Sequence, residues 1–236
     1  MIYANALIEK FQYALDNAWG YIYATAGVMW TAAKQEALEK TTDPNREMGR
    51  KYGKRWIGHY VADCSGLFSW AFKELGGYMY HGSDTMFRKY TTANGTLKSG
   101  KRTDGLELKP GTAVFVWKES EQKYSHVGLY IGNGKVIEAA STQKGVVKSN
   151  ASDKKWTHWG ELTGVTYGDA PVPEGYAVVT GKRVALRQDP SLKANIIMRI
   201  DTGKTVKIET PPPSEWEYVE YSGKKGYMMK KFLKEG

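Results

Sequence analysis

Apolar residues recur at helical spacing near the start of the chain and predict an amphipathic helix over residues 2–18. A second, shorter helix is predicted over residues 35–40, and the turn-forming residues 41–45 end it. Residues 48–60 show no periodic pattern, so we expect a loop or an insertion there. The apolar positions of the first helix are Ala4, Leu7, Ile8, Phe11, Ala14 and Leu15.

The clearest helical pattern follows Asp63, a residue type that commonly caps a helix N-terminus. Gly76 and Gly77 supply the signal that ends this helix. Cys64 therefore occupies the first turn. The apolar stripe of the helix consists of Leu67, Phe68, Ala71, Phe72 and Leu75.

Alternating patterns after this helix predict strands over residues 112–117, 126–131 and 135–140. A turn at residues 109–111 precedes the first strand, and the glycine-rich residues 132–134 connect the last two. A helical part followed by an antiparallel meander indicates the α+β class.

The C-terminal part of the chain changes character. Residues 166–175 are rich in glycine and proline, which is typical of a linker. We expect one domain over residues 1–165 and a second, a small all-β barrel, over residues 176–236. Its five predicted strands are residues 177–180, 184–187, 205–209, 216–221 and 225–229.

The formal net charge of +9 implies attraction to an anionic partner, such as nucleic acid, a membrane surface or an acidic wall polymer. The basic residues are scattered and form no nucleic-acid recognition pattern, so we expect no nucleic-acid partner. A single cysteine excludes an internal disulfide. Residues 1–16 lack the pattern of a secretory signal and no apolar run reaches transmembrane length, so we expect no membrane insertion.

Cys64 and His126 are candidates for nucleophilic chemistry. A cysteine attacks as the thiolate, and the unpaired N–H groups of a helix N-terminus favour that charged form. His126 lies on the polar side of its strand, while Val127 and Leu129 take the core side, so it can face a cleft and act as a base. The alternative is that both residues are structural, which is the commoner role of a lone cysteine or histidine.

The register of the predicted hairpin identifies a third candidate, Glu138. A two-residue turn at positions 133–134 would place Glu138 opposite Leu129 and turn a carboxylate into the core. A three-residue loop, with the last glycine as the left-handed residue of a bulge, pairs Gly128 with Glu138 instead. Glu138 then lies diagonal to His126, roughly 7 to 8 Å away between backbones. We therefore predict the bulged loop and Glu138 as the residue that orients His126.

Several motifs in order resemble the NlpC/P60 peptidase family, and the resemblance spans residues 7–163. It implies a papain-like α+β catalytic domain that hydrolyses peptidoglycan stem peptides, usually between γ-D-glutamate and the diamino acid. The motifs are residues 63–67 (DCSGL), 109–112 (KPGT), 125–134 (SHVGLYIGNG) and 136–139 (VIEA).

By this resemblance Cys64 is the nucleophile, His126 the base and Glu138 the third member of a triad. The family usually has His, Asn or Gln at the last position, so glutamate is a departure that puts activity in question. A carboxylate would hold the imidazolium more firmly than an amide does.

The resemblance also implies substrate-binding residues around the nucleophile. Asp63 and Ser65 correspond to the pair that helps bind the stem peptide, and Ser125 is expected to line the same cleft. Tyr21 resembles the tyrosine near the oxyanion, with Tyr23 as a competing assignment because the glycine pair that follows in the family is missing.

We expect neither a cofactor nor a bound metal, because the other histidines lack metal-ligand spacing. The tryptophans are expected mainly in the core. The histidines are His59, His81 and His158, and the tryptophans considered are Trp30, Trp56, Trp117, Trp156 and Trp159.

Residues 179–187, 203–206, 216–219 and 226–227 resemble a bacterial SH3 domain, although Ala185 replaces the usual asparagine. Such a domain implies binding to the bacterial cell wall. Residues 176–236 hold 12 basic and 7 acidic residues, and this net charge of +5 adds attraction to anionic wall polymers.

These features predict a monomeric peptidoglycan hydrolase, similar to a phage or prophage endolysin. Without a signal sequence, it would be made in the cytoplasm and reach the wall after lysis or by non-Sec export. Two alternatives stay open: an N-acetylmuramoyl-L-alanine amidase of similar cysteine and histidine chemistry, and a non-catalytic wall-binding or phage structural protein.

Overall fold

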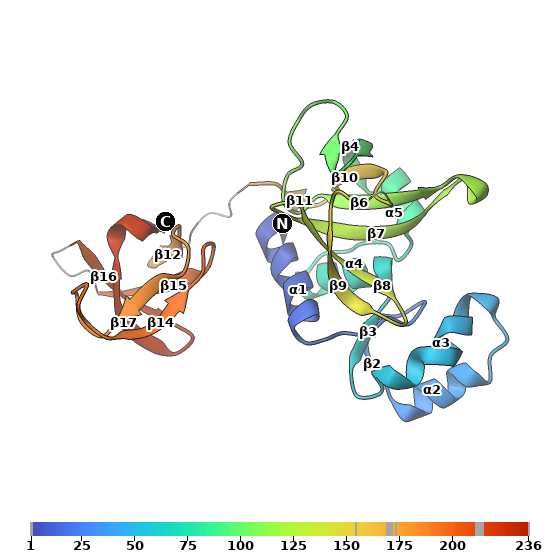
Figure 1. Ribbon diagram of the computed structural model, residues 1–236, viewed down its shortest axis with the longest axis horizontal. Coiled ribbons are helices and arrows are strands. Elements are labelled where there is room, and N and C mark those ends of the chain that lie inside the picture. Colours follow the sequence, from blue (N-terminus) through green and yellow to red (C-terminus); the bar gives the residue numbers. More distant parts are fainter. Residues whose placement is uncertain (1, 154, 169–171, 173, 211–214, 236) are drawn as a thin grey trace. The chain divides into compact units, whose positions relative to one another are not determined.

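The computed structural model describes the chain except residues 1, 154, 169–171, 173, 211–214 and 236. The chain divides into two compact units, Met1–Asp169 and Ala170–Gly236 (Figure 1). The predicted linker, residues 166–175, falls partly outside the described residues, while β11 (Val165–Thr166) still pairs within the first unit. No helix in the described part of the chain is long and apolar enough to cross a membrane.

The helices of the first unit agree with the sequence pattern where that pattern was strong. Helices α1 (Ala4–Asp16) and α2 (Ala32–Glu39) confirm the two predicted N-terminal helices, with shifted ends. Helix α4 (Cys64–Glu74) is the predicted cysteine helix. Helix α3 (Glu47–Tyr52) lies where a loop was expected, and α5 (Ser83–Lys89) was missed; both are too short to show a periodic stripe.

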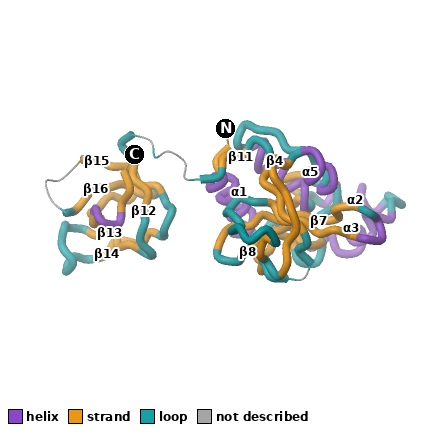
Figure 2. Tube along the Cα trace, turned by 90° about the horizontal axis from the view of Figure 1, so that it is seen from above, coloured by secondary structure: helices purple, strands orange, loops and turns teal. Residues whose placement is uncertain are grey.

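The main sheet of the first unit has seven antiparallel strands in the order β5-β4-β10-β6-β7-β8-β9. Figure 2 shows strands of this sheet, among them β4, β7 and β8, together with helices of the unit. The three predicted strands are its neighbours β6, β7 and β8. Helices combined with an antiparallel sheet confirm the α+β class of this unit. The strands are β4 (Thr91–Lys98), β5 (Lys101–Arg102), β6 (Ala113–Lys118), β7 (Lys123–Gly132), β8 (Lys135–Ser141), β9 (Gly145–Asn150) and β10 (His158–Leu162).

Two small sheets complete the unit and anchor its connections. β1 (Ile2–Tyr3) pairs with β11 in parallel and ties the start of the unit to its end. β2 (Ala26–Met29) pairs with β3 (Tyr60–Ala62), so the helical segment between them forms an excursion whose ends meet beside α4.

The main sheet is covered on both faces, because successive side chains of a strand point to opposite sides. Leu129 and Ile137 belong to the large cluster that α1 and α4 complete. Val114 and Val136 point to the other face, into a smaller cluster that contains Trp156.

The register of the β7–β8 hairpin is the predicted one, although the turn is not. Leu129 pairs with Ile137 and Tyr130 with Val136, which brings Gly128 opposite Glu138. The loop was predicted to have three residues, but Gly132 pairs with Lys135 around a two-residue turn in which both residues have positive φ. The compensating extra residue lies in β7, where the register shifts between Tyr130 and Gly132.

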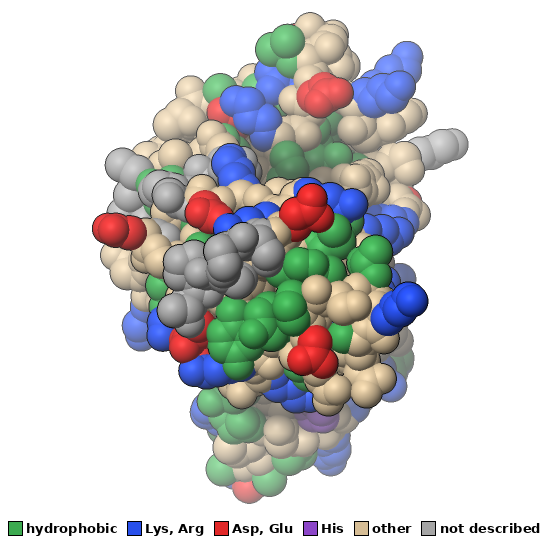
Figure 3. All heavy atoms as spheres, turned by 90° about the vertical axis from the view of Figure 1, so that its left-hand side faces the viewer, with side chains coloured by type: hydrophobic (Ala, Val, Ile, Leu, Met, Phe, Trp, Pro, Cys, Tyr) green, Lys and Arg blue, Asp and Glu red, His purple; other side chains and the backbone are tan. Residues whose placement is uncertain are grey.

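The second unit contains the five predicted strands and two that were missed, β14 and β18. Among the described residues no strand pairing joins β14 to β18 at the two ends of the sheet order, so the predicted closed barrel is not confirmed. Figure 3 shows Lys and Arg side chains dispersed over the face that it presents. The strands are β12 (Tyr176–Val179), β13 (Val184–Arg187), β14 (Ile196–Ile200), β15 (Thr205–Thr210), β16 (Trp216–Tyr221), β17 (Lys224–Met229) and β18 (Leu233–Glu235).

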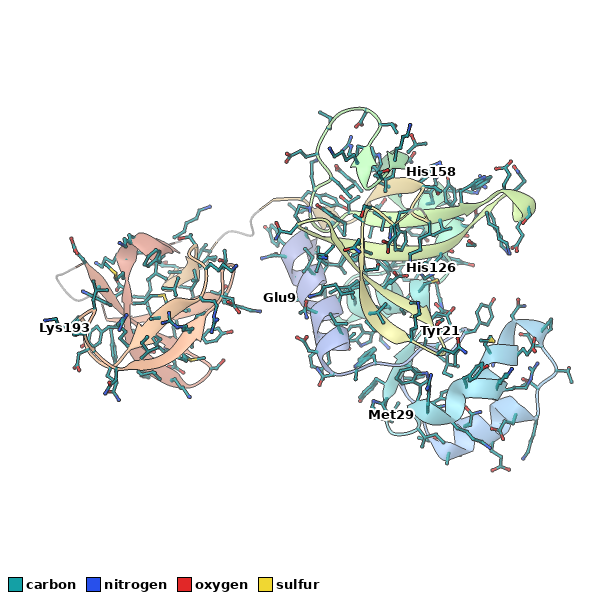
Figure 4. The ribbon with its side chains drawn as sticks, viewed as in Figure 1. Glu9, Tyr21, Met29, His126, His158 and Lys193 are labelled. Carbon is teal, nitrogen blue, oxygen red and sulfur yellow. The ribbon has the colours of Figure 1, made fainter. Side chains whose placement is uncertain are left out.

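Phe11 offers a test of the packing between α1 and α4. It is fully buried, and its ring lies edge-on to Phe68 with the centroids 4.6 Å apart. Phe11→Ala is expected to lower the free energy of unfolding by about 3–5 kcal/mol, because it leaves a cavity in the core. Glu9→Ala, on the exposed face of the same helix (Figure 4), should change it by less than about 0.5 kcal/mol. Chemical denaturation measures both, and equal effects would contradict this packing.

Candidate active site

Cys64 is the first residue of α4, and its position is fixed by Asp63 immediately before it. Asp63 Oδ1 accepts a hydrogen bond from the backbone N–H of Gly66 at 2.7 Å and so caps the helix, as predicted. Its Oδ2 accepts from the N–H of Ala24 at 2.8 Å. A Cβ on Gly66 would collide with the carbonyl oxygen of Thr25. The glycine thus lets the start of α4 approach the neighbouring segment closely.

His126 lies on β7 and connects Cys64 with Glu138. Its Nε2 lies 2.6 Å from Glu138 Oε2, and because a carboxylate only accepts, Nε2–H donates this bond. The other ring nitrogen, Nδ1, is not used by Glu138 and stays available to Cys64, which also acts on the ring. Burial by itself lowers the pKa of His126, but the hydrogen bonds and negative charges of Cys64 and Glu138 raise it to about 9. The imidazolium form therefore persists at neutral pH.

Glu138 is held by more partners than the sequence suggested. Its side chain is 1% exposed, and the carboxylate also accepts from Ser149 Oγ at 2.5 Å and from Lys155 Nζ at 2.5 and 2.7 Å. Burial raises the pKa of Glu138, but the bonds from His126, Lys155 and Ser149 outweigh it and hold the pKa at about 2. The carboxylate is therefore ionised at neutral pH.

Trp156 forms the wall behind the imidazole. Its ring stacks on His126 with centroids 5.6 Å apart and planes 19° apart. The Lys155 ammonium lies 4.5 Å from the centroid of the same tryptophan. Ser149, Lys155 and Trp156 come from β9 and the segment after it, and nothing in their local sequence marked them as neighbours of His126.

A cavity of about 530 Å³ opens in front of Cys64. The predicted residues Tyr21, Asp63, Ser65 and Ser125 all line it together with Cys64, whereas His126 and Glu138 lie outside the lining. None of the five tryptophans considered above lines this cavity. The structure thus brings the four predicted binding residues to one cavity with Cys64.

Both candidate tyrosines line this cavity, but they differ in how exposed they are and in how Cys64 affects them. Burial, followed by the charges of Cys64 and Asp63, raises the pKa of Tyr21 far above its usual value. Tyr23 is 42% exposed. Of the two tyrosines, Tyr21 is thus the less exposed one and the one whose pKa the charge of Cys64 raises.

His81 is a cavity residue that the sequence did not identify. Its Nε2 lies 2.8 Å from both carboxylate oxygens of Asp63. The hydrogen bond with Asp63 raises the pKa of His81, against the opposing effect of burial. The described residues contain no cluster of His, Cys, Asp or Glu side chains suited to a metal. The partner of His81 is a carboxylate from another part of the chain, a contact that spacing does not reveal.

The turn between β6 and β7 adds charged groups to the outer part of the cavity. Lys118, Glu121 and Lys123 line it from this side, and both lysines pair with Glu121. Asp84 faces them from α5 and accepts a hydrogen bond from the N–H of Tyr124 at 3.0 Å. The cavity mouth is therefore polar and carries both signs of charge.

Comparison with known proteins gives this geometry a context. Residues 47–163 match the sequence model of the NlpC/P60 family. The murein DD-endopeptidase MepH of Escherichia coli is 29% identical over 140 residues, which are 56% of this chain and 48% of that protein. A probable endopeptidase NlpC homolog of Haemophilus influenzae is 30% identical over 112 residues, 48% of this chain and 53% of that protein.

A third relative is the gamma-DL-glutamyl hydrolase of Bacillus subtilis, 26% identical over 120 residues, which are 50% of this chain and 26% of that protein. The chain thus spans about half the length of these curated relatives, or less.

The Glu138 contact predicts the acid–base behaviour of His126. Glu138→Gln removes a negative charge that stabilises the imidazolium, so the pKa of His126 should fall well below 9. Lys155→Met should raise the pKa of His126, because it removes the positive charge that shares the Glu138 carboxylate with the imidazolium. Histidine ring NMR measured against pH reports both shifts, and Glu9→Gln serves as a control for a charge lost from the surface. An unchanged midpoint in Glu138→Gln would contradict the assignment.

Proposed function

We propose, from the match of residues 47–163 to the NlpC/P60 family, that the chain is a peptidoglycan hydrolase that acts as a cysteine endopeptidase on wall stem peptides. The observation that carries the proposal is Cys64 at the start of α4, which acts on an imidazole that a buried carboxylate holds. This arrangement has the three parts that nucleophilic acyl transfer needs.

The chemistry follows from the protonation state of the pair. With His126 as imidazolium, Cys64 attacks the amide carbonyl carbon as the thiolate, and N–H groups at the start of α4 stabilise the oxyanion. His126 then donates its proton to the leaving amine as the C–N bond breaks and a thioester forms. Neutral His126 next takes a proton from water, which attacks the thioester and releases the peptide acid and the thiolate. Glu138 stays ionised throughout and positions the ring.

The bond proposed for cleavage is the one between γ-D-glutamate and the diamino acid. The family resemblance favours it, and so does the name of the gamma-DL-glutamyl hydrolase, whereas the name of MepH refers to a DD-endopeptidase. Tyr21, Asp63, Ser65 and Ser125 are proposed to bind the substrate around this bond, because they line the cavity in front of Cys64.

The second unit is proposed to be an SH3-like module that binds the bacterial wall. Its resemblance to bacterial SH3 domains and its net charge of +5 support this role. Attachment to an insoluble polymer would raise the local concentration of the enzyme at its substrate. Action on the wall after lysis or by a non-Sec route is part of the same proposal.

Cys64→Ala tests the proposed chemistry. It should reduce the rate of turbidity loss of purified sacculi by about 10³-fold or more, because the nucleophile is absent, while binding to sacculi in a pull-down stays unchanged. Ser69→Ala, on the same helix, controls for effects of a small substitution in α4. Binding without any Cys64-dependent lysis would contradict the enzyme proposal and support a wall-binding protein.

Product analysis tests which bond is cut. Mass spectrometry of digests from a lysine-type and a diaminopimelate-type wall should show a new free α-amine on the diamino acid. A new amine on L-alanine would instead identify an amidase, and cleavage of the cross-link between the D-alanine of one stem peptide and the diamino acid of its neighbour would identify a DD-endopeptidase. Either of these results would overturn the proposed bond.

A further inference from the structure

The second unit contains a hollow of about 230 Å³ that none of the proposed chemistry uses. Its floor lies where β13 pairs with β14, and Ala185 sits there opposite Arg199. Leu186, the next residue of β13, points to the core. The short side chain of Ala185, surrounded by long ones, leaves the hollow open. The lining consists of Lys182, Arg183, Val184, Ala185, Arg187, Leu192, Arg199, Trp216, Met229 and Phe232.

Four of the lining residues are basic and none is acidic. Lys182, Arg183, Arg187 and Arg199 form no ion pair with any described residue, whereas lysines elsewhere in the unit pair with glutamates, for example with Glu209. This clustered positive charge is therefore available to a ligand, and it favours an anion.

Two of the arginines are held in place by the backbone. Arg187 Nη1 donates to the carbonyl oxygen of Ala194 at 2.8 Å, and Arg199 Nη1 donates to that of Arg183 at 3.2 Å. Each guanidinium has five N–H donors, so most of them remain available. Guanidinium groups held in this way suit a carboxylate, which they bind through two parallel hydrogen bonds.

The rest of the lining is apolar. Leu192 is 66% exposed at this position, and Met229 and Phe232 add further apolar surface. The volume is below the range of about 300–1,000 Å³ that holds drug-sized ligands, which suits a single terminal residue. The apolar wall favours a carboxylate carried by a small apolar residue over a phosphate of a sugar or glycerol polymer.

We propose that this hollow binds the free C-terminal carboxylate of a short peptide that ends in a small apolar residue. If the proposed function holds, its source is the free end of an uncross-linked wall stem peptide, and this assignment of the source rests on that function. The second unit would then recognise the free end of a stem peptide, whereas the first unit would cut a bond within it.

Binding of a defined peptide tests the site without hydrolysis. The full chain carrying Cys64→Ala is titrated with N-acetyl-D-alanyl-D-alanine, with the same peptide as its C-terminal amide, and with glycerol 1-phosphate, and followed by calorimetry and arginine side-chain NMR. We expect the acid to bind at least tenfold more tightly than the amide and the phosphate, and to shift the Arg187 and Arg199 signals. Equal binding of the amide, tighter binding of the phosphate, or no binding of the acid would overturn the proposal.

Variants locate the site. Arg199→Gln and the cavity-filling Ala185→Leu should each weaken binding of the acid at least tenfold, while Lys224→Gln, an exposed cation outside the lining, should not. Thermal unfolding shows whether each variant is folded. Unchanged binding in folded Arg199→Gln and Ala185→Leu would refute the site. Lysis by the chain with Cys64 intact is measured separately, so a failed peptide titration and a failed enzyme assay are distinguishable.

Discussion

The contact between the buried carboxylate of Glu138 and the ring of His126 is the constraint on which the candidate active site depends. An ionised carboxylate that is 1% exposed is costly unless its oxygens are paired. The imidazole, Lys155 and Ser149 provide that pairing, and the same bonds fix the orientation of the ring. Because the two residues lie on adjacent strands in a defined register, the sheet sets this geometry. Glutamate at this position is therefore a well-supported partner of the histidine in this chain.

The thiol reaches that imidazole because the start of α4 is tied down from several sides. Asp63 caps the helix, binds the N–H of Ala24 and pairs with His81, so one carboxylate links three segments of the first unit. Gly66 allows the close approach of the backbone at Thr25. The inner part of the cavity is thus held by hydrogen bonds to Asp63, whereas its outer part carries charged side chains from β6, β7 and the turn between them.

Positive charge is arranged differently in the cavity at Cys64 and in the hollow of the second unit. Near Cys64, cations are balanced by carboxylates, as with Lys118 and Lys123 around Glu121. In the hollow of the second unit, four basic residues stand without acidic partners among the described residues. The formal net charge of +9 gives only a general preference for anionic partners. The position of the unpaired basic side chains indicates where such a partner would bind.

The sequence by itself determined the helix that begins at Cys64, the β6–β8 meander and the parity that puts Glu138 on the side of His126. These depend on local periodicity, on capping and on the rule that a one-residue slip turns every side chain to the other face. Only the tertiary structure decided that Ser149, Lys155 and Trp156 surround the His126–Glu138 pair, that His81 pairs with Asp63, and that β10 inserts beside β6. Those contacts join residues that are distant along the chain. No local pattern encodes such a contact, because it forms only when the packing of the whole unit brings the partners together.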